Sequence, residues 1–465
     1  MGTSPVFSLL FLALLVFLTP GKVHSQQEIP IEVRGPRVVI PTRVNNSPPL
    51  DVVLDTGMGM RGVYLLRREH SEWVDAPSNI LVQIPGAGGG EASRAQVVDA
   101  QTLRAGSVVL DSQTVLISQS DRTQDWSFDG IIGRSLVVDY TVELDYDRSV
   151  MRLHDRGWHP TGPEWTRLPI RIERGLPWFE VEVDMEDGVA RPIKAYLDLA
   201  SAATLELLVG SGRPFTPPSG AEEVGLGTGL SGEIRGWRGQ THRLRVGGFD
   251  LTEVPTEWAP AEIRSKGGAA GGILGNGFMH YFNVVFQYAE GALYIRPSQR
   301  YMDSYPEQAK VHAERESSHT ERRADESEKL QSSRASVETA LEAKAEEGDS
   351  PGPRWQDIAE EPVPVRYSLG PELKNWAESL RLTFEQHPPE LRDAGIGGTA
   401  HLWVLVDQDG IARKAVLRQT SGHQTLDEAA LRLARELRFH PALDGATPVP
   451  AWFAMPVQFP GGRRF

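Results

Sequence analysis

The stretch VVLDTGMG (residues 52–59) decides how the rest of the chain is interpreted. Asp-Thr-Gly is a short pattern, and Asp55 could belong to an ordinary turn or could be half of a catalytic carboxylate pair. A pair requires a second aspartate in an equivalent setting. The stretch AYLDLASA (residues 195–202) supplies one, because Asp198 also follows a run of apolar residues.

Two apolar strands that end in glycine follow the two aspartates at matching distances. GIIG (130–133) follows Asp55 and GILG (272–275) follows Asp198, at spacings that agree to within one residue. Asp145 and Gln287 then come equally far behind these strands. Landmarks that recur in the same order indicate an internal duplication.

Residues 29–297 therefore resemble the bilobal aspartyl proteases of the retropepsin or pepsin type. The resemblance implies a multidomain chain whose main part is a mainly-β region of two pseudo-symmetric lobes, residues 26–160 and 161–297. It also implies that Asp55 and Asp198 are catalytic. Two close carboxylates share a proton, so that one acts as a base on a bound water while the other donates to the scissile carbonyl.

Three further residues would support the two loops in this family, namely Thr56, Gly57 and Ser201. The second loop departs from the family pattern, because Leu199 has no hydroxyl for a hydrogen bond between the lobes and Ala200 places a methyl where a glycine is expected. Ser201 is a partial substitute. Two interpretations of the second half stay open: a working partner, or a pseudo-active half retained for the fold. No cofactor and no metal ion is expected.

Two glycine-rich segments are candidates for covering the site. IPGAGGGEAS (84–93) falls where the family has a flap over the substrate, and Gly86, Gly88 and Gly89 are the candidate flap residues. A flexible surface loop is the alternative. GLGTGLSG (225–232) has the spacing of a dinucleotide-binding loop, but a strand-like segment follows it where that function needs a helix. We interpret it as the equivalent hairpin of the second lobe.

Composition, the N-terminal segment and the charged segment 298–363 indicate which partners, chemistry and cellular location to expect. A net charge of −14 argues against a nucleic-acid partner, and the absence of cysteine excludes disulfides and thiolate chemistry. Residues 1–25 resemble a secretory signal peptide, and its cleavage would leave membrane association indirect at most; an uncleaved anchor is the alternative. Residues 298–363 are charged and poor in apolar residues, which predicts a disordered or helical linker.

The C-terminal residues 364–465 predict a small α+β domain. An amphipathic helix, TLDEAALRLARELRF (425–439), lies between strands, and a capping box of Thr425 and Glu428 is expected to begin it. The domain resembles the TonB C-terminal domain through a set of positions spread along residues 387–459: Gly398, Asp409-Gly410, Ser421-Gly422, Leu426-Asp427, Ala429-Ala430, Phe439, Pro441-Ala442, Gly445, Pro448, Trp452, Pro456-Val457 and Phe459.

This second resemblance implies an exported protein in the periplasm of a double-membrane bacterium. In that family the domain accepts a short peptide of an outer-membrane transporter by strand addition, for which the closing strand Val449–Phe459 is the candidate edge. Self-association or packing on the lobes is the alternative.

The sequence is compatible with two functions. The first is an exported aspartic endopeptidase that acts on a peptide or protein substrate and docks through its C-terminal module to a transporter or another periplasmic protein. The second is a degenerate protease scaffold that serves as a periplasmic adaptor in outer-membrane transport. The intact Asp55-Thr56-Gly57 favours the first function, and Leu199 and Ala200 favour the second.

Overall fold

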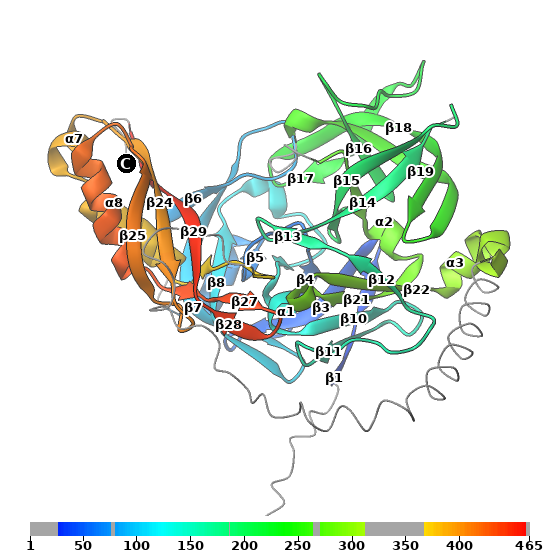
Figure 1. Ribbon diagram of the computed structural model, residues 1–465, viewed down its shortest axis with the longest axis horizontal. Coiled ribbons are helices and arrows are strands. Elements are labelled where there is room, and N and C mark those ends of the chain that lie inside the picture. The colour runs from blue at the N-terminus through cyan, green and yellow to red at the C-terminus, as the bar shows by residue number, and fades with distance from the viewer. Residues whose placement is uncertain (1–26, 76–79, 186, 264–269, 312–366, 462–465) are drawn as a thin grey trace, which may run out of the picture.

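The computed structural model describes residues 27–75, 80–185, 187–263, 270–311 and 367–461 (Figure 1). Most of the chain before residue 298 is β-structure in three sheets. The first eight-stranded sheet, here called the first sheet, has the order β2 (Glu32–Arg34), β3 (Arg37–Val44), β4 (Leu50–Leu54), β9 (Gly130–Ile132), β5 (Val63–Leu65), β8 (Val108–Ser118), β7 (Ser93–Ala105) and β6 (Leu81–Ile84).

The second eight-stranded sheet, here called the second sheet, has the same arrangement. Its order is β13 (Arg171–Glu173), β14 (Leu176–Asp184), β15 (Ala190–Asp198), β20 (Gly272–Gly275), β16 (Leu205–Val209), β19 (Phe249–Pro260), β18 (Gly232–Val246) and β17 (Glu223–Gly229). In both sheets the strand before the aspartate runs parallel to the strand that ends in glycine, β4 with β9 and β15 with β20. The pairs β5–β8 and β16–β19 are parallel as well. The strand order of one sheet therefore maps onto that of the other, position by position.

A six-stranded sheet joins the two halves of this region. Its order is β1 (Gln27–Pro30), β11 (Val150–His154), β10 (Thr141–Asp145), β21 (Phe282–Gln287), β22 (Ala292–Pro297) and β12 (Thr166–Pro169). β10 from the first half pairs antiparallel with β21 from the second, for example Val142 opposite Phe286. Buried side chains of all three sheets form one hydrophobic cluster, so the two halves share a core.

Tight turns connect neighbouring strands, and their backbone explains where glycine is needed. Gly247 and Gly248 join β18 to β19 with φ angles of 57° and 89°. Positive φ at both central residues is the geometry of a two-residue hairpin, and glycine adopts it without steric cost. Short helices fill the remaining connections: η1 (Arg68–Trp73), η2 (Asp121–Thr123), α1 (Ser135–Asp139), η3 (Ala261–Ile263), α2 (Asn276–Met279) and η4 (Tyr288–Glu290).

The beginning of the predicted linker belongs to the folded body. α3 (Gln299–Ser304) places Tyr301 in the core, where its ring packs against Phe249 and Phe282. Tyr305 is buried as well. These aromatic side chains anchor the first part of the segment whose charge and scarcity of apolar residues predict a linker. The remainder of the predicted linker, from residue 312, and the predicted signal peptide lie outside the described residues.

The C-terminal module is a three-stranded sheet covered by a helix. Its order is β25 (Ala412–Gln419), β24 (Gly398–Val406) and β29 (Ala451–Phe459). α8 (Gln424–Glu436) packs its buried Leu426, Ala430 and Leu433 against β24. The smaller elements are β23 (Glu372–Leu373), α6 (Trp376–Gln386), α7 (Pro389–Asp393), β26 (Phe439–His440), β27 (Ala442–Asp444) and β28 (Thr447–Val449).

The predicted capping box at the start of α8 is wrong. The helix begins at Gln424, and its N-cap is His423, which makes no side-chain cap hydrogen bond. Thr425 therefore lies inside the first turn. Asp427 fixes the entry instead, because its carboxylate accepts hydrogen bonds from the Thr420 hydroxyl (2.5 Å) and the Ser421 N–H (2.7 Å).

In the described ranges no helix is long and apolar enough to cross a membrane. Figure 1 shows the module, in orange and red, beside strands of the first sheet, with the second sheet in green on the other side.

Candidate active site

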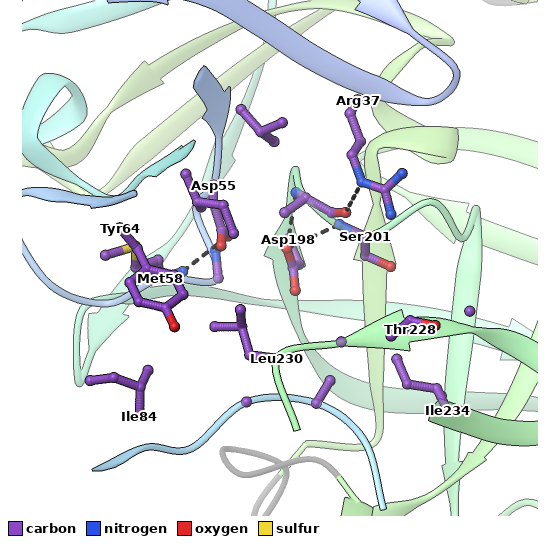
Figure 2. A pocket seen from close by; sticks show the side chains of 18 of the residues that line it. Arg37, Asp55, Met58, Tyr64, Ile84, Asp198, Ser201, Thr228, Leu230 and Ile234 are labelled. Atoms are coloured by element: carbon purple, nitrogen blue, oxygen red, sulfur yellow. Dashed lines mark hydrogen bonds between the residues drawn. The ribbon is translucent and has the colours of Figure 1, made fainter. Parts of the chain in front are cut away.

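The two aspartates predicted from the sequence line one cavity of about 460 Å³. Residues of both eight-stranded sheets form its wall, and most of them are apolar. Its lining side chains include Tyr64 from the first sheet, Phe128 from the connection before β9, and Tyr196 from the second sheet. Asp55 and Asp198 therefore meet at a cavity between the two sheets (Figure 2).

Each aspartate is held by the backbone of its own loop in the same way. Asp55 follows β4, and its Oδ1 accepts hydrogen bonds from the N–H groups of Gly57 (2.6 Å) and Met58 (3.0 Å). Asp198 ends β15, and its Oδ1 accepts from the N–H groups of Ala200 (3.0 Å) and Ser201 (3.2 Å). Backbone donors stabilise an ionised carboxylate and fix its orientation.

At Gly57 the first loop lies close to the Asp198 side chain of the second loop. A Cβ atom built on Gly57 would lie 2.6 Å from Cγ and Oδ2 of Asp198 and 2.8 Å from Oδ1. Real Cβ atoms do not approach other atoms so closely, which means that the Asp198 carboxylate occupies the space of the missing side chain. The N–H of the same Gly57 binds Asp55. The two carboxylates therefore flank one glycine.

Thr56 links the loops through its buried hydroxyl. Oγ1 donates to Leu197 O (2.9 Å) and accepts from Leu199 N–H (3.1 Å), so it satisfies two backbone groups of the second loop. Leu199 cannot return these bonds, and its side chain is fully buried in the shared core instead. The hydroxyl of Ser201 stays in its own loop, where it accepts from Ala203 N–H (3.4 Å). The hydroxyl bridge between the loops thus comes from Thr56.

Arg37 is a cavity residue that the sequence analysis missed. It begins β3, and its Nε donates to Ala200 O (3.2 Å) in the second loop. Burial lowers the pKa of the Arg37 guanidinium, and the charge of Asp198 opposes that shift. Nothing in the local sequence around Arg37 predicts that its side chain reaches a loop of the other sheet.

The glycine-rich segments 84–93 and 225–232 meet across the cavity. Gly90 N–H donates to Ser231 O (2.7 Å), Ser231 N–H donates to Ala87 O (3.0 Å), and Gly89 N–H donates to Glu233 O (3.1 Å). Residues 225–232 form the end of β17, the two-residue turn and the first residue of β18, with Gly229 opposite Gly232. This arrangement lacks the helix that a dinucleotide loop requires.

The close approach explains why both segments are rich in glycine. A Cβ on Gly88 would lie 2.4 Å from Gly232 O, and one on Gly86 would lie 2.5 Å from Leu230 Cβ. Gly88 also has a φ of +124°, which disfavours other residues. Gly89 is less restricted, because the nearest atom to its Cβ would be 3.9 Å away.

Among the described residues, no group of three or more His, Asp or Glu is placed to hold a metal ion. The charged residues that line the cavity are Asp55, Asp198, Glu257, Arg37 and Arg174. Burial raises the pKa of the nearby Tyr288, and the charge of Asp55 adds to this shift while that of Arg134 opposes it. The arrangement suits proton transfer by paired carboxylates in an apolar enclosure.

Comparisons with known proteins concern the C-terminal part of the chain. A search of the curated proteins found no match. Residues 385–460 match the family model of the Gram-negative bacterial TonB protein C-terminal, a segment that contains β24, β25, α8 and β29. The match does not extend to the two eight-stranded sheets. The chain thus joins a TonB C-terminal domain to a mainly-β region that encloses the cavity.

Proposed function

We propose that the protein is an aspartic-type endopeptidase of the bacterial envelope, exported to the periplasm, in which Asp55 and Asp198 form the catalytic pair. One observation carries the proposal: both aspartates stand at the ends of equivalent strands, are held by the same pattern of backbone donors, and line one cavity. A peptide or protein is the proposed substrate.

The strand order supports an assignment of the two halves as pseudo-symmetric aspartic-protease lobes. Eight strands correspond in order, and two parallel pairs recur in each sheet. In a duplicated arrangement each half supplies one carboxylate to the cavity between them. We retain residues 26–160 and 161–297 as the proposed lobe boundaries, with the six-stranded sheet as the joint between them.

The proposed mechanism follows from paired carboxylates. In this mechanism one carboxylate of the pair is ionised and the other is protonated. The ionised member accepts a proton from a water molecule as that water attacks the scissile carbonyl carbon. The protonated member donates to the carbonyl oxygen, and the pair later returns a proton to the leaving amine. The segments 84–93 and 225–232 would open to admit substrate and close to exclude solvent.

A cleavage assay tests the proposal. Purified full-length protein is incubated with a randomised peptide pool, and new termini are identified by mass spectrometry, with and without a statine-containing peptide that mimics the tetrahedral intermediate. We expect cleavage that the statine peptide inhibits and that Asp55→Asn abolishes. Asp187→Asn, in an exposed turn remote from the cavity, is the matched control and should cleave normally. Absence of cleavage by the wild-type protein, or full activity of Asp55→Asn, would reject the proposal.

A second function is favoured by one specific observation, the second loop itself. Leu199 and Ala200 replace the residues that the family uses, which suits a scaffold that binds and does not cut. In that case the TonB C-terminal domain would carry the function as an adaptor for an outer-membrane transporter or another envelope protein. β29 is the edge of its sheet, with β24 as its neighbour there, and it is the proposed site of strand addition.

Mapping of NMR amide shifts shows whether the C-terminal domain binds a peptide along β29, as the adaptor function requires. Addition of a transporter-derived peptide to the full chain should shift the amides of β29 and leave those of α8 unchanged. Shifts confined to α8, or none, would exclude strand addition at this edge.

A further inference from the structure

The loop that follows Asp-Thr-Gly is fixed by the residues after Gly133. Gly62 N–H donates to Ser135 Oγ (2.7 Å), and Arg134 N–H donates to Met60 O (3.0 Å). Arg134 is the N-cap of α1, and Ser135 is its first residue. The same loop carries the Gly57 and Met58 amides that orient Asp55, so its position sets the position of that carboxylate.

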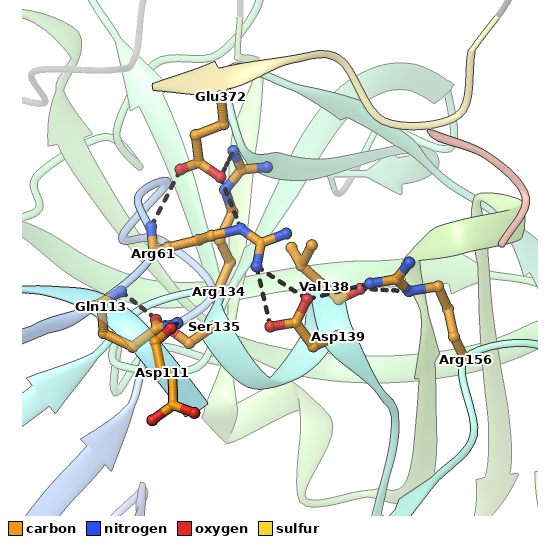
Figure 3. Close-up of polar contacts among 10 residues, drawn as sticks. Arg61, Asp111, Gln113, Arg134, Ser135, Val138, Asp139, Arg156 and Glu372 are labelled. Carbon is orange, nitrogen blue, oxygen red and sulfur yellow. Dashed lines mark hydrogen bonds and ion pairs between the residues drawn. The ribbon is translucent and has the colours of Figure 1, made fainter. Parts of the chain in front are cut away.

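A glutamate of the C-terminal module reaches this loop (Figure 3). Glu372, in β23, accepts hydrogen bonds from Arg61 N–H (3.2 Å) and Arg61 Nε (3.1 Å). Its Oε2 also lies 2.8 Å from Nη2 of Arg134. Nη1 of Arg61 in turn donates to both carboxylate oxygens of Asp139, at 2.9 and 3.0 Å. One carboxylate of the module thereby joins both the main chain and the side chain of Arg61.

This ion network is largely removed from water. The side chains of Arg61 and Arg134 are each 11% exposed and that of Glu372 is 18% exposed. Burial acts to raise the pKa of the Glu372 carboxyl, but the charges of Arg134 and Arg61 hold the pKa below its ordinary value. Removing one member of such a network leaves buried charges without compensation, which is costly. The contact is therefore a firm connection and not a loose surface pair.

α6 makes a second connection between the module and the site. Ala377 N–H donates to Asp99 Oδ2 (2.6 Å) in β7, the strand that leaves the segment 84–93. Trp376 and Leu380 pack in the cluster that contains Tyr64, a cavity residue. Further along the helix, Leu382 belongs to the core of the module. α6 thus links the module core to the wall of the cavity.

We infer that Glu372 is a positioning residue that holds the Asp55 loop in place, so that the docked C-terminal module completes the site. This inference rests on the proposed peptidase function for its effect on catalysis. Its structural part, the hold on residues 57–62, stands independently. Glu372 acts through Arg61 and Arg134 and does not itself line the cavity.

Hydrogen exchange and kinetics on the full chain test the inference together. Three variants are compared with the wild type: Glu372→Ala, Glu372→Gln and Glu385→Gln. Glu385 pairs with Arg381 on the exposed face of α6, so Glu385→Gln removes an equal charge from the same module without touching the loop. Glutamine at 372 keeps an acceptor for Arg61 N–H but loses the charge.

In Glu372→Ala we expect amides of residues 57–62 to exchange about tenfold faster and kcat to fall about 10- to 100-fold with KM little changed. Glu372→Gln should be intermediate, and Glu385→Gln should match the wild type.

Each of the other possible results contradicts a different part of the inference or of the proposed function. Exchange in Glu372→Ala equal to that in Glu385→Gln would overturn the hold on the loop. Faster exchange with unchanged kcat would overturn the catalytic role of the hold. Faster exchange without cleavage by any protein, the wild type included, would reject the proposed peptidase function while supporting the hold on the loop.

Discussion

Substitution of Gly57 by alanine should displace the Asp198 carboxylate, because the added Cβ atom would occupy its place. The new Cβ would stand 2.6 Å from Cγ of Asp198, whereas carbon atoms pack at about 3.5–4.0 Å. The carboxylate must therefore retreat by about 1 Å. It cannot do so freely, because its Oδ1 is bound to Ala200 N–H and Ser201 N–H. A shift of this size in a catalytic group costs on the order of 100-fold in kcat.

The assay is cleavage of one peptide substrate, with kcat and KM determined separately. Gly57→Ala should lower kcat by about 100-fold and change KM less, because the shift affects the reacting carboxylate more than the cavity wall. Gly157→Ala is the matched control, since a Cβ there meets no atom within 4 Å and the backbone of Gly157 is not left-handed. A Gly57→Ala protein with wild-type kcat would refute the argument that Asp198 reacts from its observed position.

Three further predictions concern the glycine-rich segment 84–93, the Thr56 hydroxyl that links the two loops, and the dependence of stability on pH. Gly88→Ala should weaken closure and lower kcat/KM about tenfold, because its Cβ would meet a carbonyl at 2.4 Å, whereas Gly89→Ala should have little effect on the same kinetics. Thr56→Val leaves two buried backbone groups of the second loop without their hydroxyl partner, and chemical denaturation should show a loss of about 1–3 kcal/mol. Burial, with the charge of Arg61, lowers the pKa of His440 to about 4. In the unfolded chain the His440 imidazole takes up a proton near pH 6.5, so the free energy of unfolding should fall as the pH drops from about 6.5 towards 4. The melting temperature of His440→Gln should fall less than that of the wild type over this window.

The sequence predicted the features that depend on local, repeated patterns. The aspartate loops follow β4 and β15, and GIIG and GILG form β9 and β20 beside them. These relations were visible because a duplication repeats its landmarks at fixed spacing. The two glycine-rich segments were also visible in the sequence, and at Gly86 and Gly88 the close approach of the opposite segment leaves no room for a side chain.

Features that depend on distant partners left no local signal. The pairing of β10 with β21 joins segments from opposite halves, and alternating apolar residues do not specify a partner strand. Glu372 is one acidic residue among many, and its importance comes from Arg61, more than 300 positions away in sequence. The start of α8 was misjudged for a related reason: the capping-box pattern was present, but Asp427 bonds to the preceding turn and fixes an earlier start.

A double-mutant cycle on the two aspartates tests the central claim most directly. Turnover of one peptide substrate is measured for the wild type, Asp55→Asn, Asp198→Asn and the double variant. If the carboxylates act as a pair, each single substitution removes nearly all activity and the double variant loses no more than either single one. Turnover by Asp198→Asn at the wild-type rate would contradict the account, because it would show that Asp55 works without the partner that the second sheet presents.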